Sequence, residues 1–131
     1  MLPERQRIEA VKGFMAPEEG NALYETALVA GRRGPCLEVG SYCGKSSVYI
    51  GAACREAGTV LFSIDHHRGS EEQQPGQDYC DPDLVDAAGR VDTFGPFRET
   101  LSAFSLEDTV VHQLDPLGGH ALVVDDPRAN R

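Results

Sequence analysis

The sequence predicts an α/β domain built on a parallel sheet, because short apolar runs alternate with helical segments. The runs cover residues 35–40, 59–65 and 109–111, and the second is almost continuously β-branched or apolar. A helical segment separates the first two runs, and this unit of about 30 residues has the size of one β-α-β crossover. Strands of this composition belong to parallel sheets that are covered on both faces.

Helices are predicted before and after the first apolar run in the sequence. Pro3 suits the first position of a short helix, and Pro17 with the acidic pair after it begins a second helix, which ends near Gly31. A third helix is expected from about residue 44 to 57, where Gly58 ends it. Apolar residues of the second helix that fall on one side at helical spacing are Leu23, Ala27, Leu28 and Ala30.

The segment 66–92 differs from its surroundings because acidic residues and chain breakers dominate it. We expect a long surface excursion with a short helical turn at residues 84–88. A loop of this length is either a solvated connection or the cover of a site. Helix resumes over residues 93–105, where the apolar residues on one face are Phe97, Leu101 and Phe104.

Residues 112–131 do not continue the alternation of strands and helices. A parallel crossover needs about a dozen residues, usually helical, and the stretch before residues 121–124 is short and contains Pro116. Residues 121–124 are therefore either an antiparallel return strand or part of a loose tail. We expect one domain over residues 1–111 and an atypical, poorly ordered tail over 112–131.

Length and charge limit the class of protein. The 131 residues allow a single domain, and 12 basic against 21 acidic residues give a formal net charge of −9, which disfavours binding to nucleic acid or anionic membranes. No apolar run approaches the roughly 20 residues that span a bilayer, and the first seven residues lack the apolar stretch of a signal peptide. We therefore expect a cytoplasmic protein whose ligands are small molecules.

The four cysteines, Cys36, Cys43, Cys54 and Cys80, form no C-x-x-C pair. Without an export signal, reduced thiols are the expectation. Because no spacing of metal ligands is visible among cysteines and histidines, no metal site is predicted.

The most informative segment is residues 37–47, in which a strand runs into a glycine turn and a helix starts directly afterwards. Glycines let the backbone turn tightly and approach a ligand without a Cβ in the way. The first amides of the new helix are unpaired donors with a partial positive charge. Such a turn can hold a phosphate, a carboxylate or a ribose edge.

The spacing of this loop disfavours two ligands that contain phosphate. A P-loop needs four residues between its first glycine and Gly-Lys-Ser, whereas three residues separate Gly40 from Gly44. In a dinucleotide fingerprint the middle glycine lies against the pyrophosphate, and Tyr42 occupies that position. A P-loop-like nucleotide-binding protein remains the less favoured alternative.

Two acidic residues favour a ligand that carries a ribose and a cationic group. Glu38, just before the turn, would repel phosphates but attract an ammonium or sulfonium group. Asp65 ends the next strand, which opens on the same crevice in a parallel sheet, and its carboxylate can accept two hydrogen bonds from a ribose diol. S-adenosylmethionine combines these groups.

Two segments resemble a known family. Residues 37–47, Leu-Glu-Val-Gly-Ser-Tyr-Cys-Gly-Lys-Ser-Ser, resemble the first motif of class I S-adenosylmethionine-dependent methyltransferases, and residues 61–72 resemble a bacterial branch of them. The resemblance covers about residues 13–111. It implies a Rossmann-like, three-layer α/β fold with amino-terminal helices and a parallel sheet in the order 3-2-1.

The resemblance also implies roles for individual residues. It assigns the amino-acid portion of the cofactor to the strand end and glycine loop, the ribose hydroxyls to Asp65, and a place beside the ribose or adenine to His66. Lys45 and Ser46 have the alternative role of simply starting the helix, and Tyr42 that of packing beneath the site. The candidate cofactor-binding residues are Glu38, Gly40, Ser41, Tyr42, Gly44, Ser46, Asp65 and His66.

The resemblance stops after residue 111, before the strands from which the family takes most of its substrate-binding and catalytic groups. We therefore expect a truncated, amino-terminal part of a methyltransferase that acts on an unidentified small molecule, and we name no catalytic residue. The alternative is a catalytically inactive module that binds the cofactor or associates with itself. An open sheet edge at the first strand would allow a homodimer.

Overall fold

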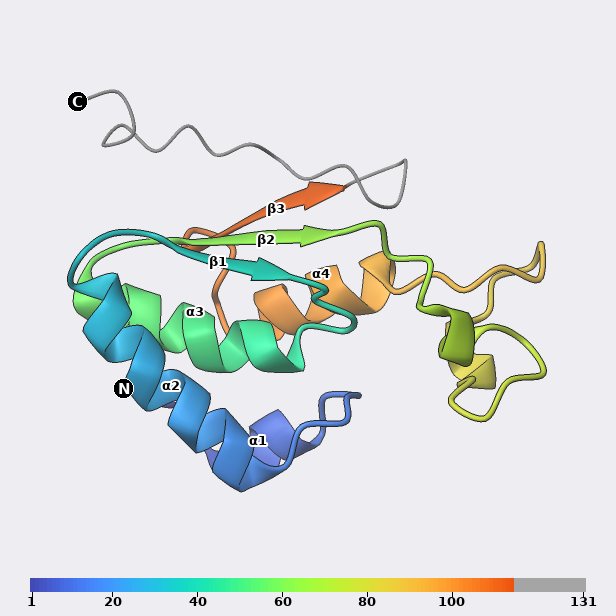
Figure 1. Ribbon diagram of the computed structural model, residues 1–131, viewed down its shortest axis with the longest axis horizontal. Helices are drawn as coiled ribbons and strands as arrows, with labels where there is room; N and C mark the ends of the chain where they lie inside the picture. The colour runs from blue at the N-terminus through green and yellow to red at the C-terminus, as the bar shows by residue number, and fades with distance from the viewer. Residues whose placement is uncertain (115–131) are drawn as a thin grey trace.

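A computed structural model describes residues 1–114, which form a three-stranded parallel sheet with helices packed against it (Figure 1). The sheet order β1-β2-β3 and the parallel pairing confirm the predicted α/β architecture and strand order. The elements are α1 (Arg5–Glu9), α2 (Pro17–Gly31), β1 (Cys36–Val39), α3 (Lys45–Ala57), β2 (Leu61–Asp65), the 3₁₀ turns η1 (Glu71–Gln73) and η2 (Pro82–Leu84), α4 (Phe94–Ala103) and β3 (Val110–Leu114).

The register of the sheet brings the carboxyl ends of all three strands to one edge. Cys36 pairs with Leu61, and Leu61 pairs in turn with Val110, so the strands run side by side from the start. β1 and β2 therefore end next to each other, where the glycine loop begins (Figure 1). In the described part of the chain β1 pairs only with β2, and self-association through its outer edge stays a prediction.

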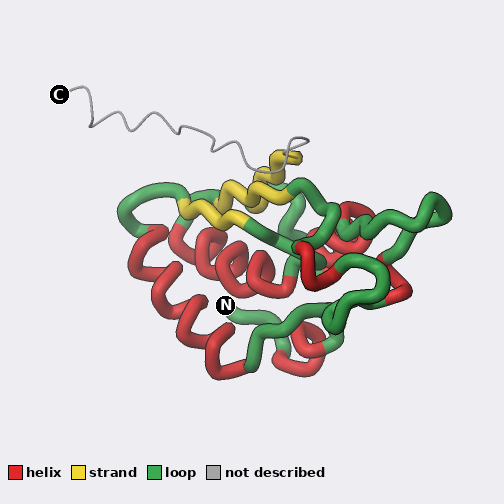
Figure 2. The backbone as a smooth tube through the Cα atoms, turned by 45° about the vertical axis from the view of Figure 1, so that its right-hand side comes forward, coloured by secondary structure: helices red, strands yellow, loops and turns green. Residues whose placement is uncertain are grey.

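The described helices lie on one face of the sheet, which differs from the expectation of helices on both faces (Figure 2). The side chains that face them are buried; Leu61 is fully buried and Val110 nearly so. Helix α3 packs against the covered face of the sheet, and α2 and α4 pack on α3. Within residues 1–114 no helical layer covers the other face. Large apolar side chains exposed on the uncovered face are Leu37, Val39, Phe62 and Val111.

Helix α2 packs on α3 through a face that the sequence pattern predicted only in part. The prediction placed Ala30 on its buried face, but Ala30 is exposed. The buried residues of α2 are Gly20, Tyr24, Ala27 and Gly31. A glycine at position 20 is required, because a Cβ there would lie 2.2 Å from the Tyr49 ring. The contact surface of α2 therefore combines small residues with the Tyr24 ring, and Leu23 and Leu28 pack partly buried against the same core.

The excursion 66–92 contains two 3₁₀ turns, and the helical turn lies earlier than predicted, at Pro82–Leu84 instead of 84–88. The Asp81 side chain accepts a hydrogen bond from the backbone amide of Asp83, which caps the turn that Pro82 begins. Lys12 Nζ contacts Asp81 Oδ2 at 2.5 Å, so the N-terminal segment is tied to the excursion. Leu84 is buried, which anchors the turn.

Helix α4 and strand β3 complete the described fold. The predicted face of α4 is confirmed, since Phe97, Leu101 and the adjoining Phe104 are buried. β3 runs to Leu114, past the boundary expected at residue 111, and the rest of the predicted tail lies outside the described residues. None of the helices in residues 1–114 has the length and apolar character needed to cross a membrane.

Candidate functional site

The loop between β1 and α3 turns through three residues in the left-handed region: Gly40 (φ +88°), Tyr42 (φ +51°) and Gly44 (φ +92°). A Cβ on Gly44 would lie 3.2 Å from both Phe97 and Thr100, so packing and backbone conformation both demand glycine there. A Cβ on Gly40 would meet nothing within 4 Å. The backbone at Gly40 is thus open to a ligand.

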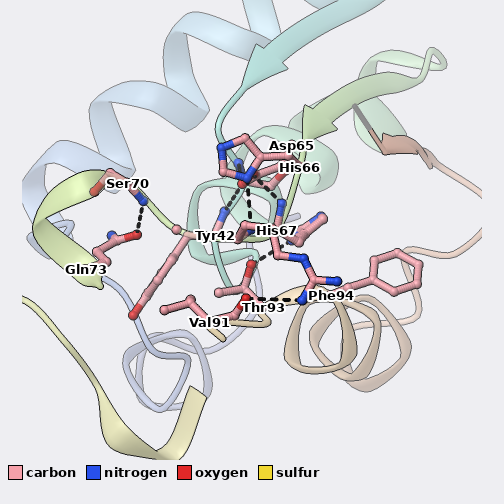
Figure 3. Close-up of polar contacts among 12 residues, drawn as sticks. Tyr42, Asp65, His66, His67, Ser70, Gln73, Val91, Thr93 and Phe94 are labelled. Atoms are coloured by element: carbon pink, nitrogen blue, oxygen red, sulfur yellow. Dashed lines mark hydrogen bonds and ion pairs between the residues drawn. The ribbon is translucent and has the colours of Figure 1, made fainter. Parts of the chain in front are cut away.

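Asp65, at the end of β2, holds the glycine loop through its carboxylate (Figure 3). Its Oδ2 accepts hydrogen bonds from the backbone amides of Ser41 and Tyr42, both at 2.8 Å, and its Oδ1 accepts one from the His67 amide at 2.9 Å. A carboxylate has about four lone-pair positions, so roughly one remains for a ligand. The two bonds expected for a ribose diol exceed this remaining capacity.

Glu38 is buried beneath the start of α3, with 9 % of its surface exposed. Its carboxylate accepts hydrogen bonds from the hydroxyls of Ser46 at 2.8 Å, Ser63 at 2.9 Å and Ser47. Burial raises the pKa of Glu38, and the three serine hydroxyls oppose that rise. The carboxylate joins β1 to β2 and α3 from below the loop.

Two adjoining pockets lie against the loop, and both are lined by Gly40, Tyr42 and Gln73. Asp65 and His66 line the first pocket, which has a volume of about 260 Å³. The second pocket, of about 170 Å³, is lined further by Lys12, Phe14, Ser41, Lys45 and Ser46. Of the eight candidate residues only Glu38 and Gly44 line neither pocket; the structure places them where they support the loop.

The two neighbouring histidines differ in their surroundings. His66 lines the first pocket, and its Nδ1 accepts a hydrogen bond from the Arg68 amide at 2.9 Å. His67 is buried, its ring centroid lies 4.9 Å from that of Phe97, and its Nδ1 lies 2.7 Å from Thr93 Oγ1 (Figure 3). Burial lowers the pKa of His67. His66 is accessible to a ligand, whereas His67 is part of the packing under α4.

Comparison with protein families gives a match over residues 37–125 to a family described as a methyltransferase domain. The chain belongs to this methyltransferase family. The match starts in β1 and includes the glycine loop and Asp65. It confirms the resemblance to class I methyltransferases and, together with the parallel sheet, the Rossmann-like fold.

Lys45 is a residue of this methyltransferase that sequence reasoning left out of the site. It is the first residue of α3, only 8 % of its surface is exposed, and it lines the second pocket. No hydrogen bond or ion pair of its ammonium group occurs within residues 1–114. Its position after Gly44 was visible in the sequence, but its burial was not.

Three aromatic rings from distant segments meet beside the second pocket of the methyltransferase. The Phe14 ring lies 5.6 Å from that of Tyr42 and 5.7 Å from that of Tyr79, in an edge-on arrangement with Tyr79. Phe14 and Tyr79 remain 64 % and 56 % exposed. The cluster joins the N-terminal segment, the loop and the excursion, and sequence spacing contains no signal for it.

Proposed function

We propose that the chain binds S-adenosylmethionine along the glycine loop and transfers its methyl group to a small-molecule acceptor. Methyl transfer in general follows from the family. The observation that supports S-adenosylmethionine as the cofactor is the backbone of Gly40, which has no side chain in the way of a ligand and lines both pockets. Asp65 lines the larger of the two. Asp65 and His66 would face the adenosine part, and the smaller pocket would take the amino-acid part.

The residues of the site would act by binding and orientation. S-adenosylmethionine supplies, when bound, a methyl group activated by a cationic sulfur. The remaining acceptor position of Asp65 suits one ribose hydroxyl, and the absence of a side chain at Gly40 allows close approach. Orientation of reacting groups can contribute a large part of a rate enhancement, so a protein nucleophile is not required.

Two observations count against the alternative of a P-loop-like phosphate site. The amides of Ser41 and Tyr42, which would have to cradle a phosphate, donate to Asp65 instead. The Ser46 hydroxyl, which would hold a magnesium ion, donates to Glu38. The donors that nucleotide phosphates need are therefore already used within the protein.

Calorimetric titration with S-adenosylhomocysteine and with magnesium-ATP tests the proposal. We expect saturable binding of the first ligand and none of the second; the reverse would refute it. Gly40→Ala should weaken binding, because the new methyl group enters the site. Gly76→Ala is the matched control, since Gly76 has nearly the same φ (+87°) and also has no neighbour within 4 Å, but it lies on the excursion.

Transfer of a labelled methyl group to a panel of small phenols, amines and carboxylic acids distinguishes the enzyme from an inactive binding module. Label found in an acceptor supports the methyltransferase. Binding of the cofactor with no transfer to any acceptor would favour the module instead.

A further inference from the structure

We propose that Cys36 and Cys54 are a modification site, at which a hydroperoxide converts two neighbouring thiols into an intramolecular disulfide between β1 and α3. All four cysteines of the chain are free thiols in the structure. Neither Cys36 nor Cys54 lines the two pockets beside the glycine loop, so the inference does not depend on the proposed function.

The first step is the contact between the two side chains. Cys36 is the first residue of β1, and Cys54 lies in the last turn of α3. Cys54 is fully buried in the core, and Cys36 packs against that core from the sheet. The Cys54 thiol is hydrogen-bonded to the side chain of Cys36. A disulfide requires neighbouring side chains of this kind, because distant cysteines cannot be bridged without moving the backbone.

The second step is the difference in exposure, which sets the order of the reaction. Cys36 is half-buried, whereas Cys54 has no exposed surface. A hydroperoxide therefore reaches Cys36 first. The Cys36 sulfur attacks one peroxide oxygen, the O–O bond breaks, and the products are a sulfenic acid on Cys36 and an alcohol or water that takes up the thiol proton.

The bond between the cysteines forms when the Cys54 sulfur attacks the Cys36 sulfur. The S–O bond of the sulfenic acid breaks, and its hydroxyl leaves as water with the proton of the Cys54 thiol. The two thiols together supply the two electrons that reduce the peroxide. Burial, together with the hydrogen bond to Cys36, raises the pKa of Cys54. Cys54 is therefore inert toward peroxide in solution and reacts with its oxidised neighbour.

The third step is the segment that the bond would enclose. It contains the rest of β1, the glycine loop and most of α3. A disulfide stabilises a protein mainly by restricting its unfolded chain, and the effect grows with the length of the closed loop. Strand β1 and helix α3 already contact each other in the fold. We therefore expect the oxidised protein to unfold at a higher temperature than the reduced one.

The number of free thiols, measured with Ellman's reagent in denaturant, tests the proposal on the full chain. After treatment of the folded protein with stoichiometric hydrogen peroxide, wild type should lose two of its four thiols and regain them with dithiothreitol. Cys36→Ala should keep all of its remaining thiols. Cys80→Ala is the matched control, because Cys80 is also half-buried but lies on the excursion, and this variant should still lose two thiols.

Mass spectrometry of a tryptic digest without reductant identifies the bonded residues in wild type and needs no variant. Trypsin separates residues 34–45 from residues 46–55, and the linked peptides should weigh two hydrogen atoms less than their sum. Because Cys43 lies in the first peptide, fragmentation must place the bond at Cys36. A bond at Cys43 or Cys80, a sulfinic acid at Cys36 with Cys54 unlinked, or four thiols left after peroxide would overturn the proposal.

Thermal unfolding provides a second criterion. Peroxide should raise the midpoint of wild type and leave that of Cys36→Ala unchanged. A lower midpoint of wild type after oxidation would also overturn the proposal, because it would mean that the folded chain does not accommodate the bond.

Discussion

Replacing Asp65 by alanine should release the glycine loop from the end of β2. The carboxylate accepts three backbone hydrogen bonds, from the amides of Ser41, Tyr42 and His67, at 2.8 to 2.9 Å. Its side chain is 13 % exposed, and Ser41 is buried. The variant therefore leaves amides with little access to water and no acceptor.

The magnitude follows from the number of these bonds. A hydrogen bond to a charged group contributes about 1.5–3 kcal/mol, and water entering the space left by the carboxylate would recover part of the sum. We expect Asp65→Ala to lower the free energy of unfolding by about 3–5 kcal/mol, a large share of the roughly 5–15 kcal/mol of a natural domain. Asp65→Asn should cost less, because its amide oxygen can still accept from Ser41 and Tyr42.

Urea unfolding followed by circular dichroism measures this effect, and Asp86→Ala is the matched control. Asp86 Oδ1 also accepts two backbone hydrogen bonds, from Ala88 and Arg90, each at 2.9 Å. Its side chain is more exposed, at 28 %, and its ion pairs with Arg68 and Arg90 are long, at 3.7 and 3.9 Å. Water can therefore replace most of what the carboxylate contributes, and the loss of stability should be much smaller than for Asp65→Ala. Equal free energies of unfolding for Asp65→Ala and Asp86→Ala would refute the reasoning.

Three further predictions have definite expected results. Gly20→Ala should lower the free energy of unfolding by about 1–3 kcal/mol, because the new methyl group overlaps with the Tyr49 ring. Gly95→Ala is the control and should not destabilise the protein, since its methyl group meets nothing within 4 Å. Equal urea midpoints for the two variants would contradict the clash with Tyr49. Burial lowers the pKa of His67 below 6.5, so the stability gained from its neutral form is present above pH 6.5 and is lost as the pH falls; His67→Asn should flatten the pH profile of the thermal midpoint there. Burial raises the pKa of Glu38 above 4.5, so the stability gained from its protonated form is present below pH 4.5 and is lost as the pH rises. The thermal midpoint of Glu38→Gln minus that of wild type should therefore increase with pH. A difference that stays constant with pH would contradict the raised pKa.

Local patterns predicted the elements of the fold well. The β-branched run of β2 and the glycines that bound α3 depend on backbone preferences of neighbouring residues, and the strands and helix lie close to where they were expected. The turn at Pro82–Leu84 was misplaced by a few residues because its start depends on capping by Asp81, a weak signal in an acidic segment.

The site was predicted in part. Strand ends and glycine spacing indicated that Asp65 and Gly40 belong together, and both border one pocket. The same pattern could not show that backbone amides of the loop occupy most of the Asp65 carboxylate, nor that three serines surround Glu38. Those partners come from other elements and depend on how the strands and helix pack.

By itself, the sequence determined that strands, helices and a glycine turn follow one another in the order of a methyltransferase domain, because these features arise from contacts between near neighbours in the chain. Only the tertiary structure decided the environment of each charge. It buried most of Lys45 and paired Lys12 with Asp81, although both lysines line the same pocket. Solvation and pairing depend on residues far apart in the chain, which no local pattern specifies.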